Sequence, residues 1–392
     1  MTQDMVREIG AMAGELVEWR RDFHRHPELS FAERRTSEVV RAFLETCGIE
    51  VRACAGTGLC GLLQGGREGP TIALRADMDA LAVAEENDTE YRSQAEGVMH
   101  ACGHDGHMAI LMGAARLLSR HRATLAGNIV FLFQPSEEDP PGGATRMIAE
   151  GALDGVDGVF GLHLWQPLPT GQVGVRSGAL MAQADKFKVV VNGRGGHASQ
   201  PHLTVDPVLV ASHVVVAAQS IASRFVDPLA PAVVSFTTVH GGRVHNIIPD
   251  SVTLTGTVRT LDLGVQGAIK ARLREVCEQT CRAFGASADF EYEDGYPPLI
   301  NDASMVDLVT RAARRELGDT HVTTIEPVMG GEDFAFYLQR VPGAFMMLGA
   351  GDGMRYPHHN ARFDIDERVL PLGVRLMTAV ALEALATRVA GR

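Results

Sequence analysis

Short apolar runs alternate with helical patterns along much of the chain, and this alternation restricts the fold more than any other feature. Residues 71–76, 128–134 and 156–164 read as strands, whereas residues 107–118 and 145–151 read as helices. Periods of two and of 3.6 residues distinguish the two kinds of segment. Strands that alternate with helices predict an α/β domain with a largely parallel or mixed sheet.

The pattern changes near Asp185 and changes back near residue 296. Between these points the segments read strand, helix, strand, strand, helix, strand: 186–192, 205–224, 232–240, 251–260, 263–284 and 286–292. This β-α-β-β-α-β order is typical of a ferredoxin-like domain. We therefore expect two domains, a discontinuous α/β domain of residues 1–184 and 297–392 and an inserted ferredoxin-like domain of residues 185–296.

Charge and apolar patterning exclude several classes of protein. The chain has 36 basic and 48 acidic side chains and a formal charge of −12, which disfavours binding to nucleic acid or to anionic membranes. The most apolar stretch, Val205 to Ala222, contains Asp206 and Gln219 and is expected to fall short of a membrane span. The charged N-terminus and six scattered cysteines favour a cytoplasmic protein with reduced thiols.

Residues 100–107 form a dense set of side chains that can bind a metal. His-Ala-Cys-Gly-His-Asp-Gly-His places three histidines, one cysteine and one aspartate in eight residues, just before a predicted helix. Gly103 and Gly106 allow the backbone to turn so that neighbouring donors face one centre. We expect the helix N-terminus to lower the pKa of Cys102. The structural alternative is a polar loop that Asp105 caps.

Other candidate residues follow the ends of predicted strands, where ligands bind in open α/β sheets. Asp77 and Asp79 follow one strand and Glu137-Glu138 follow another. Adjacent residues in an extended chain point in opposite directions, so one glutamate can bind a cation while the other acts as a general base. His163 ends a third strand. A solvated acidic turn and a buried core histidine are the structural alternatives.

The motifs closely resemble those of one enzyme family. They are RRDFHRHPEL (20–29), ALRADMDAL (73–81), MHACGHDGH (99–107), FQPSEE (133–138), GLHLW (161–165), GGHASQPH (195–202), NIIPD (246–250) and GGEDF (330–334). Together they resemble the hippurate hydrolases, a branch of N-acyl-amino-acid and auxin-conjugate amidohydrolases. This branch belongs to the dinuclear-metal aminoacylase and carboxypeptidase family. The resemblance runs from about residue 12 to residue 385.

The resemblance implies a role for specific residues. It implies two divalent metal ions, with zinc favoured and manganese, nickel or cobalt as alternatives, on Cys102, His104, Glu138, His163 and His359. His358 is the alternative last ligand, although His359 sits four residues before Phe363 as the family pattern requires. Glu137 matches the general base. The inserted domain matches a lid that also makes a dimer contact. In that lid His197 would stabilise the oxyanion, and Asn246 and Arg259 would lie near the substrate carboxylate.

One departure from more distant relatives concerns Arg75. Those relatives carry histidine there, whereas a guanidinium stays protonated and cannot bind a metal. We expect the Cys102 thiolate to supply the missing ligand, and Asp77 and Asp79 to serve as supporting or structural charges.

The function implied is metal-dependent hydrolysis of the amide bond of N-acyl amino acids, hippurate-like or N-acetylated, to a carboxylic acid and a free amino acid. A homodimer or higher homo-oligomer is expected. A dipeptidase or carboxypeptidase with the same chemistry is the nearest alternative. A second alternative uses Cys102 as nucleophile with His104 or His107 as base. A third, a non-catalytic metal- or ligand-binding protein, is disfavoured because it would not need Glu137.

Overall fold

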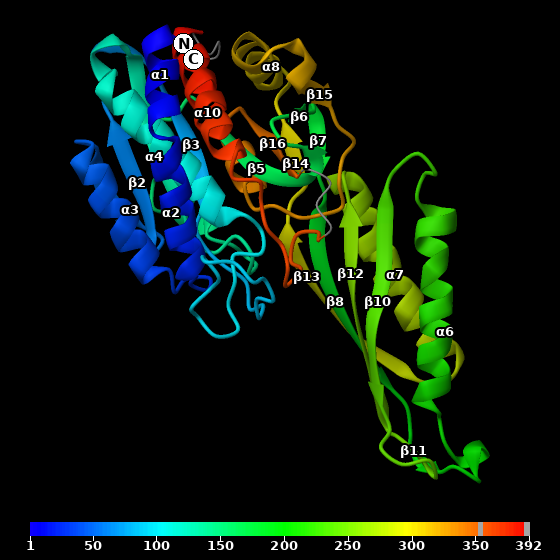
Figure 1. Cartoon of the computed structure of the whole chain (residues 1–392). Helices are drawn as coiled ribbons and strands as arrows, with labels where there is room; N and C mark the ends of the chain where they lie inside the picture. The colour runs from blue at the N-terminus through cyan, green and yellow to red at the C-terminus, as the bar shows by residue number, and fades with distance from the viewer. Residues whose placement is uncertain (352–355, 388–392) are drawn as a thin grey trace. The chain divides into compact units, whose positions relative to one another are not determined.

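The computed structural model describes residues 1–351 and 356–387, and the chain divides into two compact units (Figure 1). The first unit comprises Met1–Gly178, Ile300–Glu326 and Asp333–Arg392, and the second comprises Ala179–Leu299 and Pro327–Glu332. The insertion was expected at residues 185–296, a few residues inside the second unit. Residues 352–355 and 388–392 of the expected 297–392 segment lie outside the described residues.

An eight-stranded mixed sheet forms the centre of the first unit (Figure 1). Its order is β1 (Glu50–Cys54), β2 (Gly58–Leu63), β4 (Ala126–Gln134), β3 (Arg67–Asp77), β5 (Gly158–Pro169), β16 (Gly343–Gly351), β6 (Val173–Val175) and β15 (Val322–Thr324). The neighbours β4, β3, β5 and β16 run parallel, whereas β1, β2 and β4 pair antiparallel. This architecture confirms the predicted mixed-sheet α/β fold.

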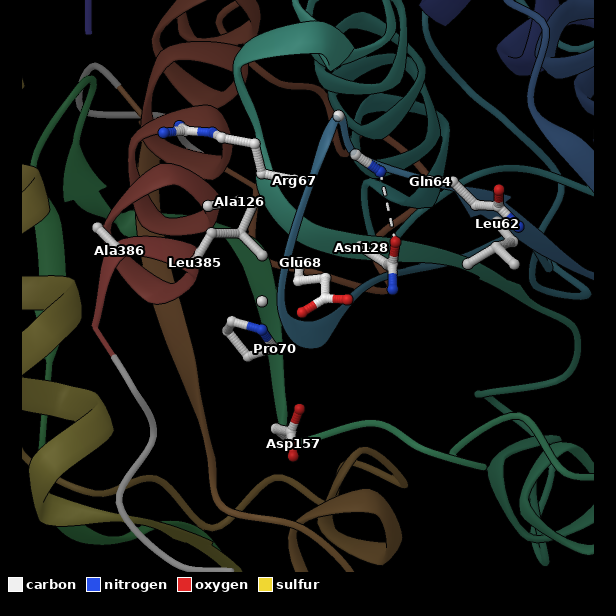
Figure 2. A pocket seen from close by; sticks show the side chains of 13 residues that line it. Leu62, Gln64, Arg67, Glu68, Pro70, Ala126, Asn128, Asp157, Leu385 and Ala386 are labelled. Atoms are coloured by element: carbon white, nitrogen blue, oxygen red, sulfur yellow. Dashed lines mark hydrogen bonds between the residues drawn. The ribbon is translucent and has the colours of Figure 1, made fainter.

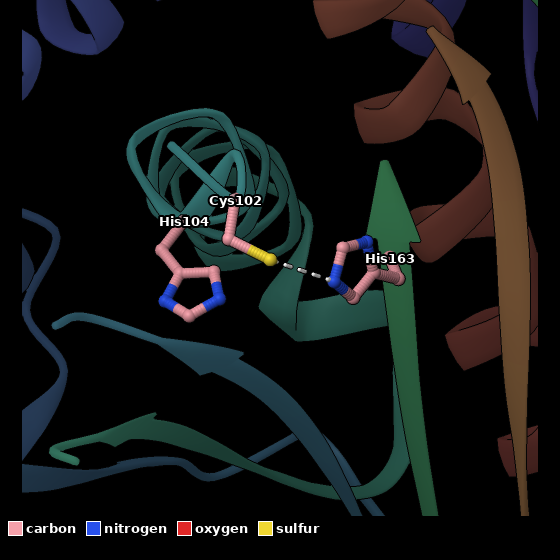
Figure 3. Close-up of side chains that lie close together, drawn as sticks. All are labelled: Cys102, His104 and His163. Atoms are coloured by element: carbon pink, nitrogen blue, oxygen red, sulfur yellow. Dashed lines mark hydrogen bonds between the residues drawn. The ribbon is translucent and has the colours of Figure 1, made fainter. Parts of the chain in front are cut away.

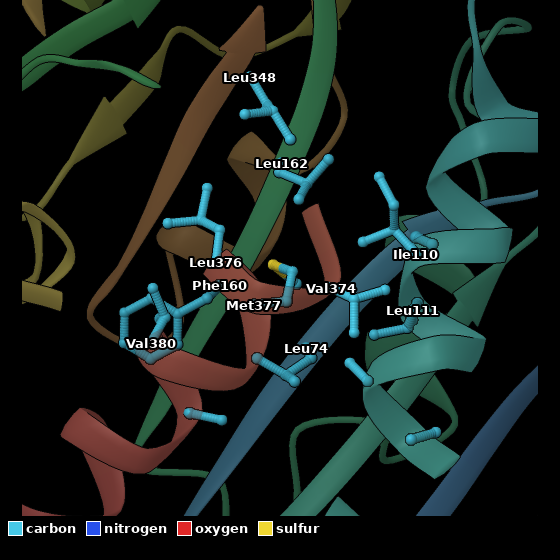
Figure 4. Close-up of a cluster of buried hydrophobic side chains, with 14 of the residues drawn as sticks. Leu74, Ile110, Leu111, Phe160, Leu162, Leu348, Val374, Leu376, Met377 and Val380 are labelled. Atoms are coloured by element: carbon cyan, nitrogen blue, oxygen red, sulfur yellow. The ribbon is translucent and has the colours of Figure 1, made fainter. Parts of the chain in front are cut away.

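The helices of the first unit bury apolar faces against this sheet or, as α1 and α2 do, against other helices. They are α1 (Gln3–Ala11), α2 (Ala13–Arg25), α3 (Arg34–Thr46), α4 (His104–Arg120), α5 (Ala144–Ala149), α8 (Ala303–Leu317), α9 (Ala335–Leu338) and α10 (Val369–Ala386). Figure 4 shows side chains of α4 and α10 meeting those of the central strands, including Leu74 and Phe160. The two helices approach closely at Gly373, where a Cβ would lie 2.4 Å from Ile110 Cδ1.

The second unit has the predicted ferredoxin-like topology. Its elements are β8 (Gln183–Asn192), α6 (Pro207–Ser220), β10 (Ala232–Gly241), β12 (Ser251–Thr260), α7 (Leu263–Ala283) and β13 (Ser287–Tyr296). The strands form an antiparallel sheet in the order β10-β12-β8-β13. Along β8, Phe187, Val189 and Val191 are buried and alternate with more exposed residues. Cys277 and Cys281 are buried in the same core.

Short elements complete both units. They are strands β7 (Gly178–Met181), β9 (Gly196–His197), β11 (Ile247–Ile248) and β14 (Leu299–Asn301), and single turns η1 (Arg122–Thr124), η2 (Pro201–Leu203), η3 (Ile221–Phe225) and η4 (Asp319–His321).

Within residues 1–351 and 356–387, two helices are long and apolar enough to cross a membrane by length and composition. The helix Val369–Ala386 has a mean hydropathy of 1.7 and is 67% buried, whereas Pro207–Phe225 has 1.4 and is 28% buried. The second passes this test although the sequence stretch was expected to fall short. Such evidence is weak, because buried helices of soluble proteins pass the same test.

Candidate metal centre

The candidate ligands come from four segments of the first unit, and β5 runs on past His163, which was expected to end its strand. Cys102 and His104 lie at the start of α4, Glu138 follows β4, His163 lies within β5, and His359 is in the loop after β16. The parallel register explains why they meet. Arg75 of β3 pairs with both Leu132 of β4 and Gly161 of β5, and so the carboxyl ends of β3 and β4 lie level with His163, inside β5.

The structure brings all five predicted ligands together. Figure 3 shows Cys102 Sγ pointing at His163 Nε2, at 3.5 Å, with His104 beside them. Glu138 Oε1 lies 3.8 Å from His104 Nε2 and 3.3 Å from His359 Nε2. Three groups of donor atoms overlap, and within each group the atoms lie within 4.8 Å of one another. The groups are Cys102, His104 and His163; Cys102, Glu138 and His359; and His104, Glu137 and Glu138.

Hydrogen bonds to backbone carbonyls fix which ring nitrogen faces the centre. His104 Nδ1 donates to the carbonyl of Asp79 at 2.8 Å, and His163 Nδ1 donates to that of Leu164 at 2.8 Å. In the neutral ring, the form that binds a metal, each Nδ1 therefore carries the proton and each Nε2 presents a lone pair. A metal-binding histidine is typically oriented in this way.

The two C-terminal histidines have different surroundings. His358 Nε2 donates to the carbonyl of Leu164 at 3.0 Å, and its ring stacks on Trp165 with centroids 4.8 Å apart. His359 instead has a positive φ of 67° and directs Nε2 towards Glu138. The geometry thus favours His359 as the fifth donor, because the Nε2 of His358 is already engaged.

His107 is buried beside the centre, but both of its ring nitrogens have partners. Its Nδ1 lies 2.6 Å from Asp77 Oδ1, and its Nε2 accepts from the amide of Leu164 at 2.9 Å. It is therefore unable to serve as the base of a cysteine nucleophile without losing these bonds. This geometry disfavours the alternative in which Cys102 and His107 form a nucleophile and base.

The expected low pKa of Cys102 is contradicted. Burial, followed by the charges of Glu138 and Glu137, raises the pKa of this thiol well above its ordinary value. These local effects outweigh the helix N-terminus, which carries only a partial charge. At His104, burial lowers the pKa, but the charges of Asp77 and Asp79 outweigh this effect and raise the pKa to about 10. The carboxylates thus create a negative potential that favours a cation.

The donor set fits a divalent metal pair. His104 Nε2 and Glu138 Oε1 are buried and have no hydrogen-bond partner among the described residues. Such buried atoms are costly unless a ligand satisfies them. A thiolate, imidazoles and a carboxylate are a mixed S, N and O set of the kind that binds zinc or a similar ion. Glu137, which is 6% exposed, lies with His104 and Glu138 in one group.

Arg75, which cannot bind a metal, forms buried ion pairs beside the centre. Its guanidinium lies 2.6 Å from Asp77 Oδ2 and 2.9 Å from Asp333 Oδ1, and Nε donates to Gln134 Oε1 at 2.9 Å. Asp77 in turn holds His107. Asp77 Oδ2 also lies 3.8 Å from Nε2 of the candidate ligand His104, and so Asp77 contacts the centre directly.

The remaining predicted residues lie in the second unit. His197 is exposed in β9, and its Nδ1 accepts from the amide of Ser199 at 3.1 Å, so Nε2 carries the proton. Asn246 is exposed before β11, and its carbonyl accepts from the amide of Ala198. Arg259 is half-buried in β12 and donates to the carbonyl of Val258 at 3.1 Å.

A large surface hollow lies at the other ends of the central strands. This hollow has a volume of about 1170 Å³ and is lined by residues 64–70, which span the loop after β2 and the start of β3, together with Asn128, Asp157 and Leu385. Figure 2 shows side chains that line it. It contains none of the metal-centre donors. Figure 2 also marks the bond from the Gly65 amide to Asn128 Oδ1, at 3.3 Å.

Sequence reasoning missed one group close to the centre. Glu33 is 0% exposed, and its Oε1 accepts from the amide of Ser136, next to Glu137. Asp79, which was expected to be a supporting or structural charge, accepts from the amides of both Glu137 and Glu138. The sequence signal for Glu33 is slight, because an acidic residue just before a helix usually serves only to cap it.

Comparisons with known proteins agree with this centre. The model of peptidase family M20/M25/M40 matches residues 73–383. Thermostable carboxypeptidase 2 of Saccharolobus solfataricus is 41% identical over 97% of this chain and 99% of its own length. N-acetyl-L-cysteine deacetylase of Bacillus subtilis is 43% identical over 92% of this chain and 86% of its own length.

A solved structure of the same family is also similar to this chain. A dinuclear metal-binding peptidase of the M20 family from Bacillus subtilis superposes with a TM-score of 0.85 and is 36% identical, covering 96% of this chain and 99% of that protein. The amidohydrolase branch that the sequence motifs resemble lies within this family. The chain belongs to peptidase family M20/M25/M40 and is a metal-dependent hydrolase of linear amide bonds.

Proposed function

We propose that the chain hydrolyses N-acyl amino acids, hippurate-like or N-acetylated, to a carboxylic acid and a free amino acid. The observation that carries the proposal is the convergence of Cys102, His104, Glu138, His163 and His359 beside Glu137. The similarity to an N-acetyl-L-cysteine deacetylase supports the substrate class.

Two divalent ions would be held by these five donors. Zinc is the favoured metal because thiolate and imidazole donors suit it, and manganese, nickel or cobalt are alternatives. When bound, such ions polarise the scissile carbonyl and lower the pKa of a water molecule.

Glu137 is the proposed general base. Its carboxylate lies in one group with His104 and Glu138, whereas its backbone neighbour Glu138 supplies a donor atom. Glu137 takes a proton from the attacking water and then passes it to the departing amine nitrogen. The burial of the glutamate, at 6% exposed, limits competition from bulk solvent for that proton.

Three residues of the second unit complete the proposed chemistry. His197 would donate its Nε2 proton to the developing oxyanion, a role supported by the bond that fixes its tautomer. Arg259 and Asn246 would bind the α-carboxylate of the substrate. A guanidinium forms strong, geometrically specific bonds to carboxylates, which offers one way for a chain of net charge −12 to bind an anion.

We also propose a cytoplasmic homodimer or higher homo-oligomer that acts on small molecules rather than on nucleic acid or membranes. The α6 helix exposes Val208, Leu209 and Val216, with Val216 at 72%, and β10 is an edge strand of its sheet. An exposed apolar helix beside an unpaired strand edge is a surface suited to another copy of the chain.

A carboxypeptidase or dipeptidase is the second candidate function, because a carboxypeptidase is 41% identical over 97% of this chain. A substrate panel of hippurate, N-acetyl amino acids and dipeptides separates the two. We expect kcat/KM to be highest for an N-acyl amino acid, since the proposed site recognises an acyl amide and a free α-carboxylate. Faster hydrolysis of dipeptides would favour the peptidase, and hydrolysis of none would contradict both.

A further inference from the structure

Three consecutive backbone amides in the turn after β4 donate to two buried carboxylates. The amide of Ser136 donates to Glu33 Oε1 at 2.9 Å, that of Glu137 to Asp79 Oδ1 at 2.9 Å, and that of Glu138 to Asp79 Oδ2 at 3.0 Å. Glu33 is 0% exposed and Asp79 is 1% exposed. Successive N–H groups of this kind form a concavity that binds anions. Here the chain's own side chains occupy it.

The turn needs this support because its backbone is strained. Ser136 has a φ of 52°, in the left-handed region that residues other than glycine rarely adopt. Phe31, with a φ of 59°, also donates its amide to Glu33 Oε1, and the Thr57 hydroxyl donates to Glu33 Oε2 at 2.6 Å. Glu33 therefore ties three segments together. Strained backbone persists only where its surroundings over-determine it.

Asp79 also connects the turn to a candidate metal ligand. Its carbonyl accepts from His104 Nδ1 at 2.8 Å, and its Oδ1 lies 3.4 Å from the same nitrogen. The Ser30 hydroxyl donates to its Oδ2 at 2.7 Å. One residue thus orients the backbone of Glu137 and Glu138 and the ring of His104.

We propose that Glu33 and Asp79 form a carboxylate clamp, a pair of positioning residues that fixes the direction in which Glu137 and Glu138 point. The inference rests on the proposed function for the roles of those two glutamates. A fixed direction matters because a misplacement of about 1 Å can lower a rate by roughly 10²-fold. The clamp acts by accepting hydrogen bonds, and so the number of acceptor oxygens determines the effect of a substitution.

Glu33 and Asp79 should therefore differ in how they tolerate replacement of the carboxylate by an amide. Glu33 Oε1 accepts both amides, while Oε2 faces the Thr57 hydroxyl, which can itself accept a bond. Glutamine therefore fits at Glu33. At Asp79 each oxygen accepts a different amide, so asparagine would place its NH₂ against an N–H group.

The test compares Asp79→Asn, Glu33→Met and Glu33→Gln in the full, zinc-loaded chain. We expect Asp79→Asn and Glu33→Met to lower kcat for an N-acetyl amino acid by about 10- to 100-fold with KM within about threefold. Glu33→Gln should restore most of the kcat that Glu33→Met loses. Hydrogen exchange of the peptide spanning residues 133–139, measured with and without zinc, should quicken in the first two variants.

Asp157→Asn is the matched control. Asp157 Oδ2 accepts from the amide of Thr71 at 2.9 Å, at the other end of β3 from the centre, and so kcat and exchange at 133–139 should stay unchanged. Unchanged exchange or unchanged kcat in both Asp79→Asn and Glu33→Met would overturn the clamp. If Asp79→Asn does not fold, an equal loss in Glu33→Gln and Glu33→Met overturns it. A wild-type chain that hydrolyses no substrate would refute the proposed function instead. In that case hydrogen exchange at residues 133–139 in the variants and the wild type still tests whether the clamp holds the turn.

Discussion

We expect the Glu137→Gln variant to keep its metal ions and to lose about 10²- to 10⁴-fold in kcat, the usual contribution of a general base. Glutamine has nearly the same shape but accepts no proton at neutral pH. The five candidate donors are untouched by this change. The measurement is kcat on an N-acetyl amino acid at saturating zinc, together with elemental analysis of the purified variant.

Glu138→Gln is the matched comparison, because it changes the neighbouring carboxylate in the same turn. Glu138 Oε1 lies close to both His104 and His359, so this variant should lose metal affinity as well as activity. Near-normal kcat in Glu137→Gln, or equal metal loss in the two variants, would contradict the separate roles assigned to the two glutamates.

The second large effect concerns stability. We expect Arg75→Met to lower the free energy of unfolding by about 3–5 kcal/mol, because it leaves the buried carboxylate of Asp333 without its cation and removes one of the cations beside Asp77. Burial already raises the pKa of Asp333 to about 6, although the Arg75 charge lowers it. Urea unfolding of the metal-free chain measures the change without a contribution from bound ions.

Two further variants show whether the effect comes from the buried pairs. Arg75→Lys keeps the charge but not the planar fork that reaches both carboxylates, and should cost less than Arg75→Met. Arg7→Met breaks an exposed pair with Asp4, at 75% and 74% exposure, and should change stability by at most about 0.5 kcal/mol. A similarly small change in Arg75→Met would mean that the buried pairs contribute little.

The sequence predicted the fold well wherever periodicity was strong. The alternating residues of β8 and the long helix α7 appear where they were expected, since one buried face determines each pattern. The hairpin of β1 and β2 was not predicted. Its strands span only Glu50–Cys54 and Gly58–Leu63, and β1 is mostly exposed, so neither strand is long enough to show a clear period.

The candidate donors were predictable because their residue types are unusual and dense, as at Cys102 and His104. Their supporting contacts were not. Glu33 meets Ser136 across 103 residues, and Arg75 meets Asp333 across 258 residues, and no local pattern encodes such pairs. The pKa of Cys102 was mispredicted for the same reason, because its direction depends on burial and on Glu138, which only the folded chain brings together.

Metal content before and after chelation is the measurement that tests the central claim most directly. The proposed centre predicts two divalent ions per chain, loss of both ions and of amide hydrolysis on chelation, and recovery with Zn²⁺, Mn²⁺, Co²⁺ or Ni²⁺. A purified chain that holds no metal and hydrolyses N-acyl amino acids equally well with and without a chelator would contradict it. Inactivation of that metal-free chain by a thiol-alkylating reagent would instead favour Cys102 as nucleophile.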